Sequence, residues 1–254
     1  MSILPSWKTL NPFFGDKGIP FSYRMKGNVI VLEQASIELL PTLLQGHRNA
    51  KEVELRTGVV SKRQILDDNF HHEAMSRLED REKRGRPDVA HFALLEVTSA
   101  PLYLENQVDV AIHTLNDCTI WLKEGVRLPR TLQRFNGVVS KILLEEIGKE
   151  EEKLFRLERN QSIEQLLKEI GPSSVISLTR LGKPTDLREF LSANSSDNQT
   201  RVWIVGGFAF GHFVEEVIEF SDDLFSISSY PLPAHVVTAR LVYELERSQS
   251  RAVK

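Results

Sequence analysis

A short arginine-rich segment offers the clearest chemistry in this chain of 254 residues. It reads RLPRTLQRF over residues 127–135 and contains Arg127, Arg130 and Arg134. A helix is predicted to begin within it, so Arg130 and Arg134 should share one helix face. Guanidinium groups donate paired hydrogen bonds to phosphate oxygens, which favours an RNA contact. The alternative is a solvated face with intrahelical ion pairs, but the next acidic residues along the chain come only at 145–146.

A second basic segment reads KRGRPD over residues 83–88. Arg86 could meet a phosphate, and Asp88 could hold that arginine in place through an ion pair. The alternative is a flexible loop, the default for a basic Gly-Pro segment. Because the net charge of the chain is −3, RNA affinity would have to come from local patches. The two patches are Arg81, Lys83, Arg84 and Arg86, and Lys123, Arg127, Arg130 and Arg134.

Two segments near the C-terminus could hold a small ligand with their backbones. Residues 205–211 read VGGFAFG and follow a predicted strand, but they lack the GxGxxG spacing and the Lys-Ser/Thr pair of nucleotide loops. The alternative there is a tight turn that needs positive φ. Residues 226–234 read SISSYPLPA and place amides and hydroxyls before a helix start, where they could bind a carboxylate or an adenine edge. The alternative there is an ordinary helix N-cap.

Histidine and cysteine usage argues against a metal centre. His71 and His72 are adjacent, and neighbouring helical side chains point about 100° apart, so they would chelate poorly. No HExxH pattern is present. His91 and His113 lie within apolar runs and are expected to be hydrogen-bonded core residues. The single cysteine, Cys118, excludes an intrachain disulfide and a cysteine-based metal cluster.

The elements that must position these residues alternate between strands and helices, which predicts an α/β fold with a parallel sheet. Apolar, β-branched runs predict strands at 28–33, 108–113, 119–122, 174–179, 201–208 and 224–230. Asn116–Asp117 would form a hairpin turn between the second and third of these. Helices are predicted as a short turn at 35–41, and at 70–78, 130–147, 163–170, 186–191 and after Pro231. Residues 89–98 fit a strand or a helix, and 45–65 are expected to be irregular.

The length suits one large domain, and no internal boundary is evident. We expect an N-terminal extension at 1–27 and a single domain at 28–254, with a small β-rich insertion at about 100–125. No apolar run approaches the roughly 18 residues that a membrane span needs. The N-terminus lacks the basic start and continuous apolar core of a secretory signal.

In their order along the chain, these motifs resemble the pseudouridine N1-methyltransferase family of ribosome biogenesis. The likeness runs from about residue 28 to 246. RGRPD and RLPRTxxRF are specific in combination. The matching segments are ASIELLP (35–41), DDNFHHEAM (67–75), KRGRPDVAHFALLEV (83–97), VRLPRTLQRFNGVV (126–139), VGGFAFG (205–211) and SISSYPLPA (226–234).

The resemblance implies a SPOUT fold with a trefoil knot at about 174–246, an exception to the rule against threaded chains. It also implies a cytoplasmic homodimer that uses S-adenosylmethionine and no metal. The methyl group would go to N1 of a pseudouridine in small-subunit ribosomal RNA. Two alternatives stay open, namely a SPOUT enzyme acting on transfer RNA and a ribosome-assembly factor whose binding matters more than catalysis. A metal-dependent enzyme using His71 and His72 is a third.

The resemblance also assigns residues. Arg86, Arg127, Arg130 and Arg134 would contact the RNA. Asp88 would orient Arg86 through a salt bridge rather than act as a base. The implied cofactor contacts are Leu178, Thr179, Gly206, Gly207, Gly211, Ser226, Ile227, Ser228, Ser229, Tyr230 and Pro231. The departures from the family pattern are Pro233, where a small hydroxyl residue is usual, and the more apolar loop created by Phe208 and Phe210.

Overall fold

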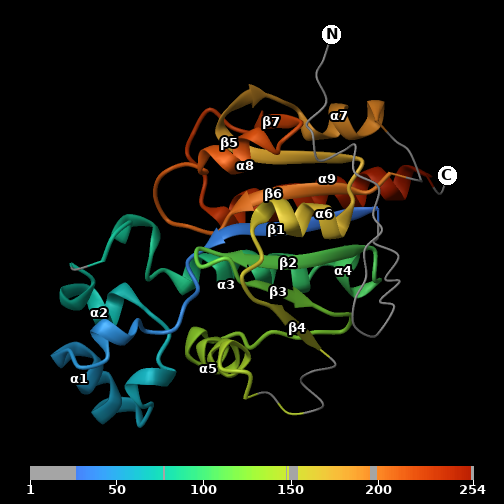
Figure 1. Cartoon of the computed structure of the whole chain (residues 1–254). Coiled ribbons are helices and arrows are strands. Elements are labelled where there is room, and N and C mark those ends of the chain that lie inside the picture. The colour runs from blue at the N-terminus through green and yellow to red at the C-terminus, as the bar shows by residue number, and fades with distance from the viewer. Residues whose placement is uncertain (1–26, 77, 147, 149–153, 195–198, 253–254) are drawn as a thin grey trace.

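A computed structural model describes residues 27–76, 78–146, 148, 154–194 and 199–252. Except for Gly27, the expected N-terminal extension lies outside these residues, as does the centre of the loop expected at 192–200. No helix in these ranges has both the length and the apolar character needed to cross a bilayer. Figure 1 shows a sheet with helices on both faces and a small lobe beside it.

Seven strands form a single sheet in the order β4-β3-β2-β1-β6-β5-β7. β1 pairs in parallel with β2 and β6, and β5 pairs in parallel with β6 and β7, while β3 and β4 are antiparallel. The parallel centre confirms the predicted α/β class. The strands are β1 (Asn28–Ala35), β2 (Val108–Thr114), β3 (Thr119–Leu122), β4 (Phe155–Glu158), β5 (Ser174–Pro184), β6 (Arg201–Gly206) and β7 (Asp223–Ser226).

The hairpin of β2 and β3 lies inside this sheet rather than on its outside. β2 pairs with β1 from Asn28 opposite Val108 onward, and β3 continues the sheet toward β4. We expected residues 100–125 as a small insertion, but the parallel pairing of β2 with a central strand makes them part of the main core. The turn residues Asn116–Asp117 predict that β2 pairs with β3, but they do not reveal that β2 also pairs with β1 on its other side. β4 had no sequence prediction, since only Phe155 of its four residues is buried.

Helices cover both faces of the sheet (Figure 1). Alternate residues of β1 serve the two layers, with Ile30 and Leu32 in one core and Val29 and Val31 in the other. α6 (Ile163–Ile170) and α8 (Glu215–Glu219) cover the face of Val29. The face of Ile30 is covered by α3 (Pro87–Thr98), α4 (Pro101–Leu104), α5 (Leu132–Leu143), α7 (Leu187–Ala193) and α9 (Ala234–Ala252).

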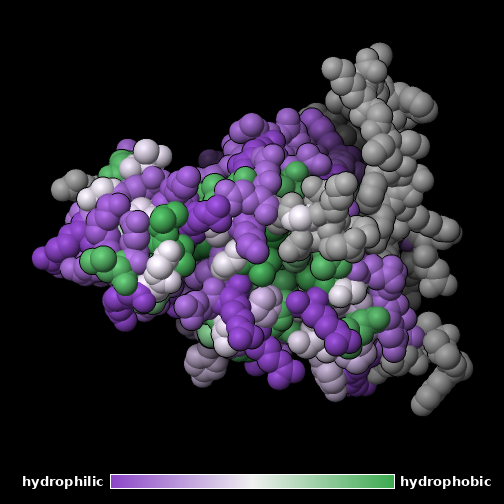
Figure 2. All heavy atoms as spheres, turned by 90° about the horizontal axis from the view of Figure 1, so that it is seen from below, coloured by the Kyte–Doolittle hydropathy of each residue, from purple (hydrophilic) through white to green (hydrophobic). Residues whose placement is uncertain are grey.

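Residues 36–86 form a small lobe beyond the C-terminal end of β1, at the left of Figure 1. The lobe contains α1 (Arg48–Thr57), α2 (Asp68–Met75) and three 3-10 turns (Thr42–Leu44, Ser61–Arg63 and Arg81–Lys83). Its separate small core consists of Leu40, Leu44, Ala50, Leu66, Ala74 and Met75. Seen from below, its surface is mostly hydrophilic with separate apolar spots (Figure 2). Such scattered apolar residues are ordinary on a monomer surface.

Two helix predictions and one prediction of irregular structure need correction. Residues 35–41 are extended rather than helical, because the Leu40 N–H donates to Gln64 O and the Leu66 N–H to Glu38 O. Residues 45–65 are not irregular but contain α1, which buries only Ala50 and so lacks an apolar stripe in sequence. α5 is shorter than the predicted 130–147.

A buried ion pair joins the two central strands β1 and β2. The Nδ1 atom of His113 lies 2.9 Å from a Glu33 carboxylate oxygen, and its Nε2 donates to Gln161 O at 2.8 Å. Burial raises the pKa of Glu33, against the opposing hydrogen bond from His113. Burial alone would lower the pKa of His113, but the hydrogen bond and charge of Glu33 raise it above its ordinary value. The folded pair therefore retains a proton that the unfolded chain releases.

This pair predicts a stability that falls as the pH rises. Both pKa values are raised by folding, so the stabilisation by His113 is complete below pH 6.5 and is lost as the pH rises through the folded pKa. One proton gives a slope of at most about 1.4 kcal/mol per pH unit. We expect His113→Asn and Glu33→Gln to flatten the pH dependence of the free energy of urea unfolding. His212→Asn, which removes an exposed imidazole, should leave the slope unchanged. Equal slopes in all four proteins would contradict the pairing.

Candidate functional site

A cavity of about 400 Å³ opens at the C-terminal ends of β6 and β7, beside the middle of β5, where the pairing of β5 with β6 ends. In sheets with parallel strands this is the edge where ligands usually bind. Three chain segments line it, namely 178–180, 205–213 (without Gly207) and 225–237 in part. The strand ends bring together two motifs that stand about twenty residues apart in sequence. Both motifs, VGGFAFG and SISSYPLPA, are the segments that the sequence predicts as candidate ligand-binding loops.

Most of the predicted cofactor contacts line this cavity. They are Leu178, Thr179, Gly206, Gly211, Ser226, Ile227, Ser228, Tyr230 and Pro231. Gly207 and Ser229 do not line it. Most of the other lining residues lie within the two motifs, among them Phe208 and Phe210. The sequence analysis did not name the lining residues outside the motifs, which are Arg180, His212, Phe213, Phe225 and Val237.

Gly207 packs against the end of β1 instead. A Cβ atom at this position would lie 2.7 Å from Ala35 Cα, so only glycine fits. The Gly207 N–H donates to Glu33 O at 2.7 Å, and Gly207 O accepts from the Ser36 N–H at 3.1 Å. The alternative interpretation, a turn that needs positive φ, applies in this loop only to Gly211, with φ +96°. Close approach of two backbones is therefore what requires glycine at 207.

The segment at 226–234 folds back on itself before α9 begins. Ser226 Oγ donates to Ser228 O at 3.0 Å, and Ser228 Oγ accepts from the Tyr230 N–H at 3.0 Å. These serines thus hold the loop and not the helix N-terminus, where Pro233 O accepts from the Val236 and Val237 N–H groups. Pro233, the departure from the family pattern, is exposed and lies outside the cavity lining. It leaves the cavity open.

Asp88 holds Arg86 as expected. Arg86 Nε donates to Asp88 Oδ1 and its Nη2 to Oδ2, both at 2.8 Å. These hydrogen bonds raise the pKa of Arg86 above its ordinary value, against partial burial. The Arg86 N–H donates to Ser36 Oγ at 2.7 Å, the same serine whose N–H reaches Gly207. The RGRPD turn is therefore two hydrogen bonds away from the cavity wall.

The other three cations of the first basic patch serve different partners. Arg84 makes a paired ion contact with the buried Glu38, at 2.7 and 2.6 Å. Arg81 lies 3.0 Å from His72 Nδ1, and Lys83 Nζ donates to His212 O at 2.8 Å. Because Glu38 is 46 residues away in sequence, nothing near the patch revealed this pairing. The patch is thus a set of separate contacts rather than one phosphate site.

The second basic segment is exposed and anchored at its proline. His91 Nε2 lies 2.7 Å from Pro129 O, and the His91 ring stacks on that of Phe135 with centroids 4.5 Å apart. Arg127, Arg130 and Arg134 form no ion pair with any residue that the structure describes. The acidic residues at 145–146 instead pair with Arg159 and Arg63. Three exposed guanidiniums without carboxylate partners are suited to phosphate.

Arg130 and Arg134 do not share a helix face, because α5 begins only at Leu132. Arg130 lies two residues before the helix, and Arg134 lies in its first turn. Pro129, held by the buried His91, fixes an extended entry to the helix. The expectation of a common helix face was therefore wrong.

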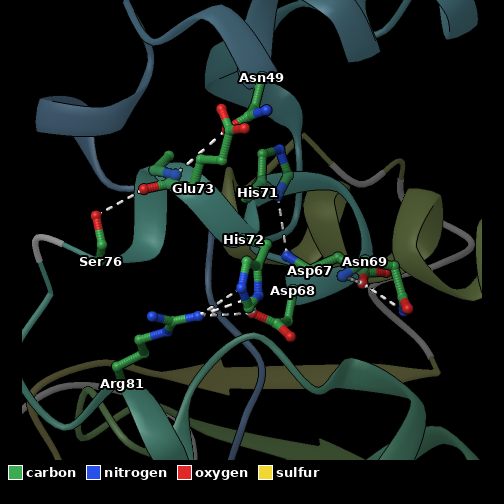
Figure 3. A network of polar contacts seen from close by, with 10 residues as sticks. Asn49, Asp67, Asp68, Asn69, His71, His72, Glu73, Ser76 and Arg81 are labelled. Atoms are coloured by element: carbon green, nitrogen blue, oxygen red, sulfur yellow. Dashed lines mark hydrogen bonds and ion pairs between the residues drawn. The ribbon is translucent and has the colours of Figure 1, made fainter.

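The two adjacent histidines point to different partners (Figure 3). His71 is buried and accepts the Asp67 N–H on Nδ1 at 3.0 Å, while its Nε2 faces Gln64 Oε1 at 3.0 Å. Burial lowers the pKa of His71. His72 turns to the surface, where it lies between Asp68 and Arg81. Among the described residues no group of three or more His, Cys, Asp or Glu is placed to hold a metal.

α3 connects the parts of the site. Asp88 in its first turn holds Arg86, and His91 one turn later holds Pro129. The adjacent Phe92 ring meets the edge of His235, which follows the cavity residue Ala234. The arginine segments and the cavity are thus anchored to one helix.

Comparison with known proteins identifies the family. The family model for EMG1/NEP1 methyltransferases matches residues 30–246. The ribosomal RNA small subunit methyltransferase Nep1 of Archaeoglobus fulgidus is 33% identical over 235 residues, which cover 89% of this chain and 99% of that protein. The protein of the same name from Staphylothermus marinus is 30% identical over 221 residues, covering 85% and 94%.

A solved structure agrees with these sequence matches. The crystal structure of Archaeoglobus fulgidus Nep1 bound to S-adenosylhomocysteine superposes with a TM-score of 0.76 at 31% identity. The match covers 88% of this chain and 99% of that one. This chain therefore belongs to the EMG1/NEP1 methyltransferase family.

Proposed function

We propose that this protein transfers a methyl group from S-adenosylmethionine to N1 of a pseudouridine in small-subunit ribosomal RNA. The observation that carries the proposal is the cavity at the ends of β6 and β7 and beside β5, which α3 connects to the segment of three exposed arginines. Relatives over nearly the whole chain are named ribosomal RNA small subunit methyltransferases, and one was solved with S-adenosylhomocysteine.

The cavity residues fit this cofactor. A volume of about 400 Å³ is in the range of sites for small ligands. Leu178, Val205 and Val237 offer apolar contacts for an adenine ring. The loop at 226–231 offers backbone amides and carbonyls for its polar edge, and Arg180 could meet the carboxylate. Among the residues that the structure describes, no Asp or Glu lines the cavity.

Catalysis would consist mainly of positioning. The bound cofactor supplies an activated methyl group on a sulfonium. Arg127, Arg130 and Arg134 would bind phosphates, and Arg86 would be held in its orientation by Asp88. Fixing N1 in line with the methyl group removes the entropic cost of their encounter. Both Asp88 oxygens already accept from Arg86, so we assign Asp88 as a positioning residue and not as the base for the N1 proton.

The proposal predicts one modified nucleoside. Small-subunit ribosomal RNA incubated with the protein and methyl-labelled cofactor should yield N1-methylpseudouridine after digestion. RNA that contains uridine in place of pseudouridine should remain unlabelled. Gly206→Trp should abolish labelling, since even a Cβ at 206 would meet the Phe208 ring at 2.9 Å. Its folding is checked by its melting temperature. Label in transfer RNA alone would favour the other substrate, and no label in either RNA would favour a non-catalytic assembly role.

The exposed arginines predict a change in salt dependence. Arg130→Ala and Arg134→Ala should each weaken binding to a small-subunit ribosomal RNA transcript. Each should also reduce the slope of log affinity against log salt by about 0.7 to 0.9, the value for one phosphate contact. Arg188→Ala is the matched control, because that arginine is exposed on α7, which lies by β5 and β7 at the opposite edge of the sheet from α5 (Figure 1). Unchanged slopes for Arg130 and Arg134 would contradict phosphate binding at this segment.

We further propose that the chain is a homodimer and that residues of about 174–246 are threaded in a trefoil knot. The supporting observations are the family membership and the exposed aromatic side chains of Phe92 and Tyr243 on α3 and α9. A pair of chains would cover these rings. Light scattering at micromolar concentration should give about twice the chain mass of 29.0 kDa, and a mass of one chain would contradict the dimer.

A further inference from the structure

The wall of the cavity formed by residues 206–213 is attached to β1 at both ends. At its start, Gly207 exchanges backbone hydrogen bonds with Glu33 and Ser36. Just past its end, the Val214 N–H donates to the Gln34 side-chain oxygen at 3.2 Å. Between these two anchors lies a turn at 208–212 whose residues line the cavity. The side chain that contacts this turn from the lobe is Lys83.

Lys83 makes two contacts with the turn, and its stem passes close to a third residue. Its Nζ donates to His212 O at 2.8 Å and lies 5.2 Å from the centroid of the Phe208 ring. Its Cε would lie 3.2 Å from a Cβ at Gly211, so the lysine stem passes close to that residue. The Phe208 ring stands over Gly206 and meets Phe213 edge to face, with centroids 5.7 Å apart. An ammonium that bridges a carbonyl and an aromatic face fixes both.

The base of this lysine is itself held firmly. Lys83 ends the short turn Arg81–Lys83, and the next residue, Arg84, is fixed by its paired contact with the buried Glu38. The lobe therefore holds the backbone from which the Lys83 side chain reaches the turn. Lys83 Nζ donates its hydrogen bond to the cavity wall, although Lys83 belongs to the basic segment KRGRPD, whose composition suggested contact with RNA.

We propose that Lys83 is a positioning residue for the cofactor, which holds the 208–212 turn over the cavity, and that it is not a phosphate ligand of the RNA. The inference rests on the proposed function, because it takes the cavity as the S-adenosylmethionine site. By this inference, the residues of the KRGRPD segment have two separate roles. Lys83 serves the cofactor side, and Arg86, with Asp88, faces the RNA.

The single variant Lys83→Met tests whether Lys83 acts on the cofactor or on the RNA. Lys83→Met keeps the stem beside Gly211 and removes the ammonium. We expect its affinity for S-adenosylhomocysteine, measured by calorimetry, to fall about tenfold, the effect of losing one charged contact. The slope of log affinity against log salt for a small-subunit ribosomal RNA transcript should stay unchanged. Lys83→Arg should recover most of the cofactor affinity, which a loss of packing alone would not predict.

The controls keep the result interpretable. Lys62→Met removes an exposed lysine of the same lobe and should change neither cofactor affinity nor melting temperature. Hydrogen exchange of amides 208–212 should be faster in Lys83→Met than in the wild type, at equal melting temperature. Unchanged cofactor affinity in Lys83→Met would overturn the inference, whatever the RNA slope does. Absence of cofactor binding in the wild type would instead refute the proposed function.

Discussion

The close approach of the Gly207 backbone to the end of β1 is the contact on which the site depends. Because a Cβ would lie 2.7 Å from Ala35 Cα, β6 can run into the cavity loop here only with glycine. The same contact places Gly207 O on the Ser36 N–H, and the Ser36 hydroxyl accepts the Arg86 N–H. Hydrogen bonds through Gly207 and Ser36 thus link the cavity wall, the end of the central strand β1 and the RGRPD turn.

The arginines of the two basic segments fall into two groups, those that pair with a carboxylate of the chain and those that do not. Arg84 is neutralised by the buried carboxylate of Glu38, and this pair joins the last part of the lobe to its first part. Arg86 is oriented by Asp88 but remains partly exposed. Arg127, Arg130 and Arg134 have no ion-pair partner among the described residues. With a net charge of −3, such unpaired groups would provide a local binding place for phosphate on a chain that is acidic as a whole.

The sequence predicts those parts whose signals are local. α6 was placed at its observed bounds, because Ser162 and Gln165 form a capping box and Gly171 ends the helix in a left-handed conformation. The two motifs that line the cavity and the Arg86–Asp88 pair are also local, and the sequence predicts that pair. α1 was missed because it buries only Ala50. The roles of Gly207, Arg84 and Lys83 depend on partners distant in sequence, such as Ala35, Glu38 and His212, which spacing along the chain cannot reveal.

Hydrogen exchange of the purified protein with and without saturating S-adenosylhomocysteine tests the central claim most directly. If the cavity is the cofactor site, exchange should slow in the segments around 178–180, 205–213 and 225–237. The outer part of the lobe, α1 and α2, should exchange at the same rate in both samples. Protection confined to the lobe, or no protection in the three cavity segments, would contradict the assignment of this cavity to the methyl donor.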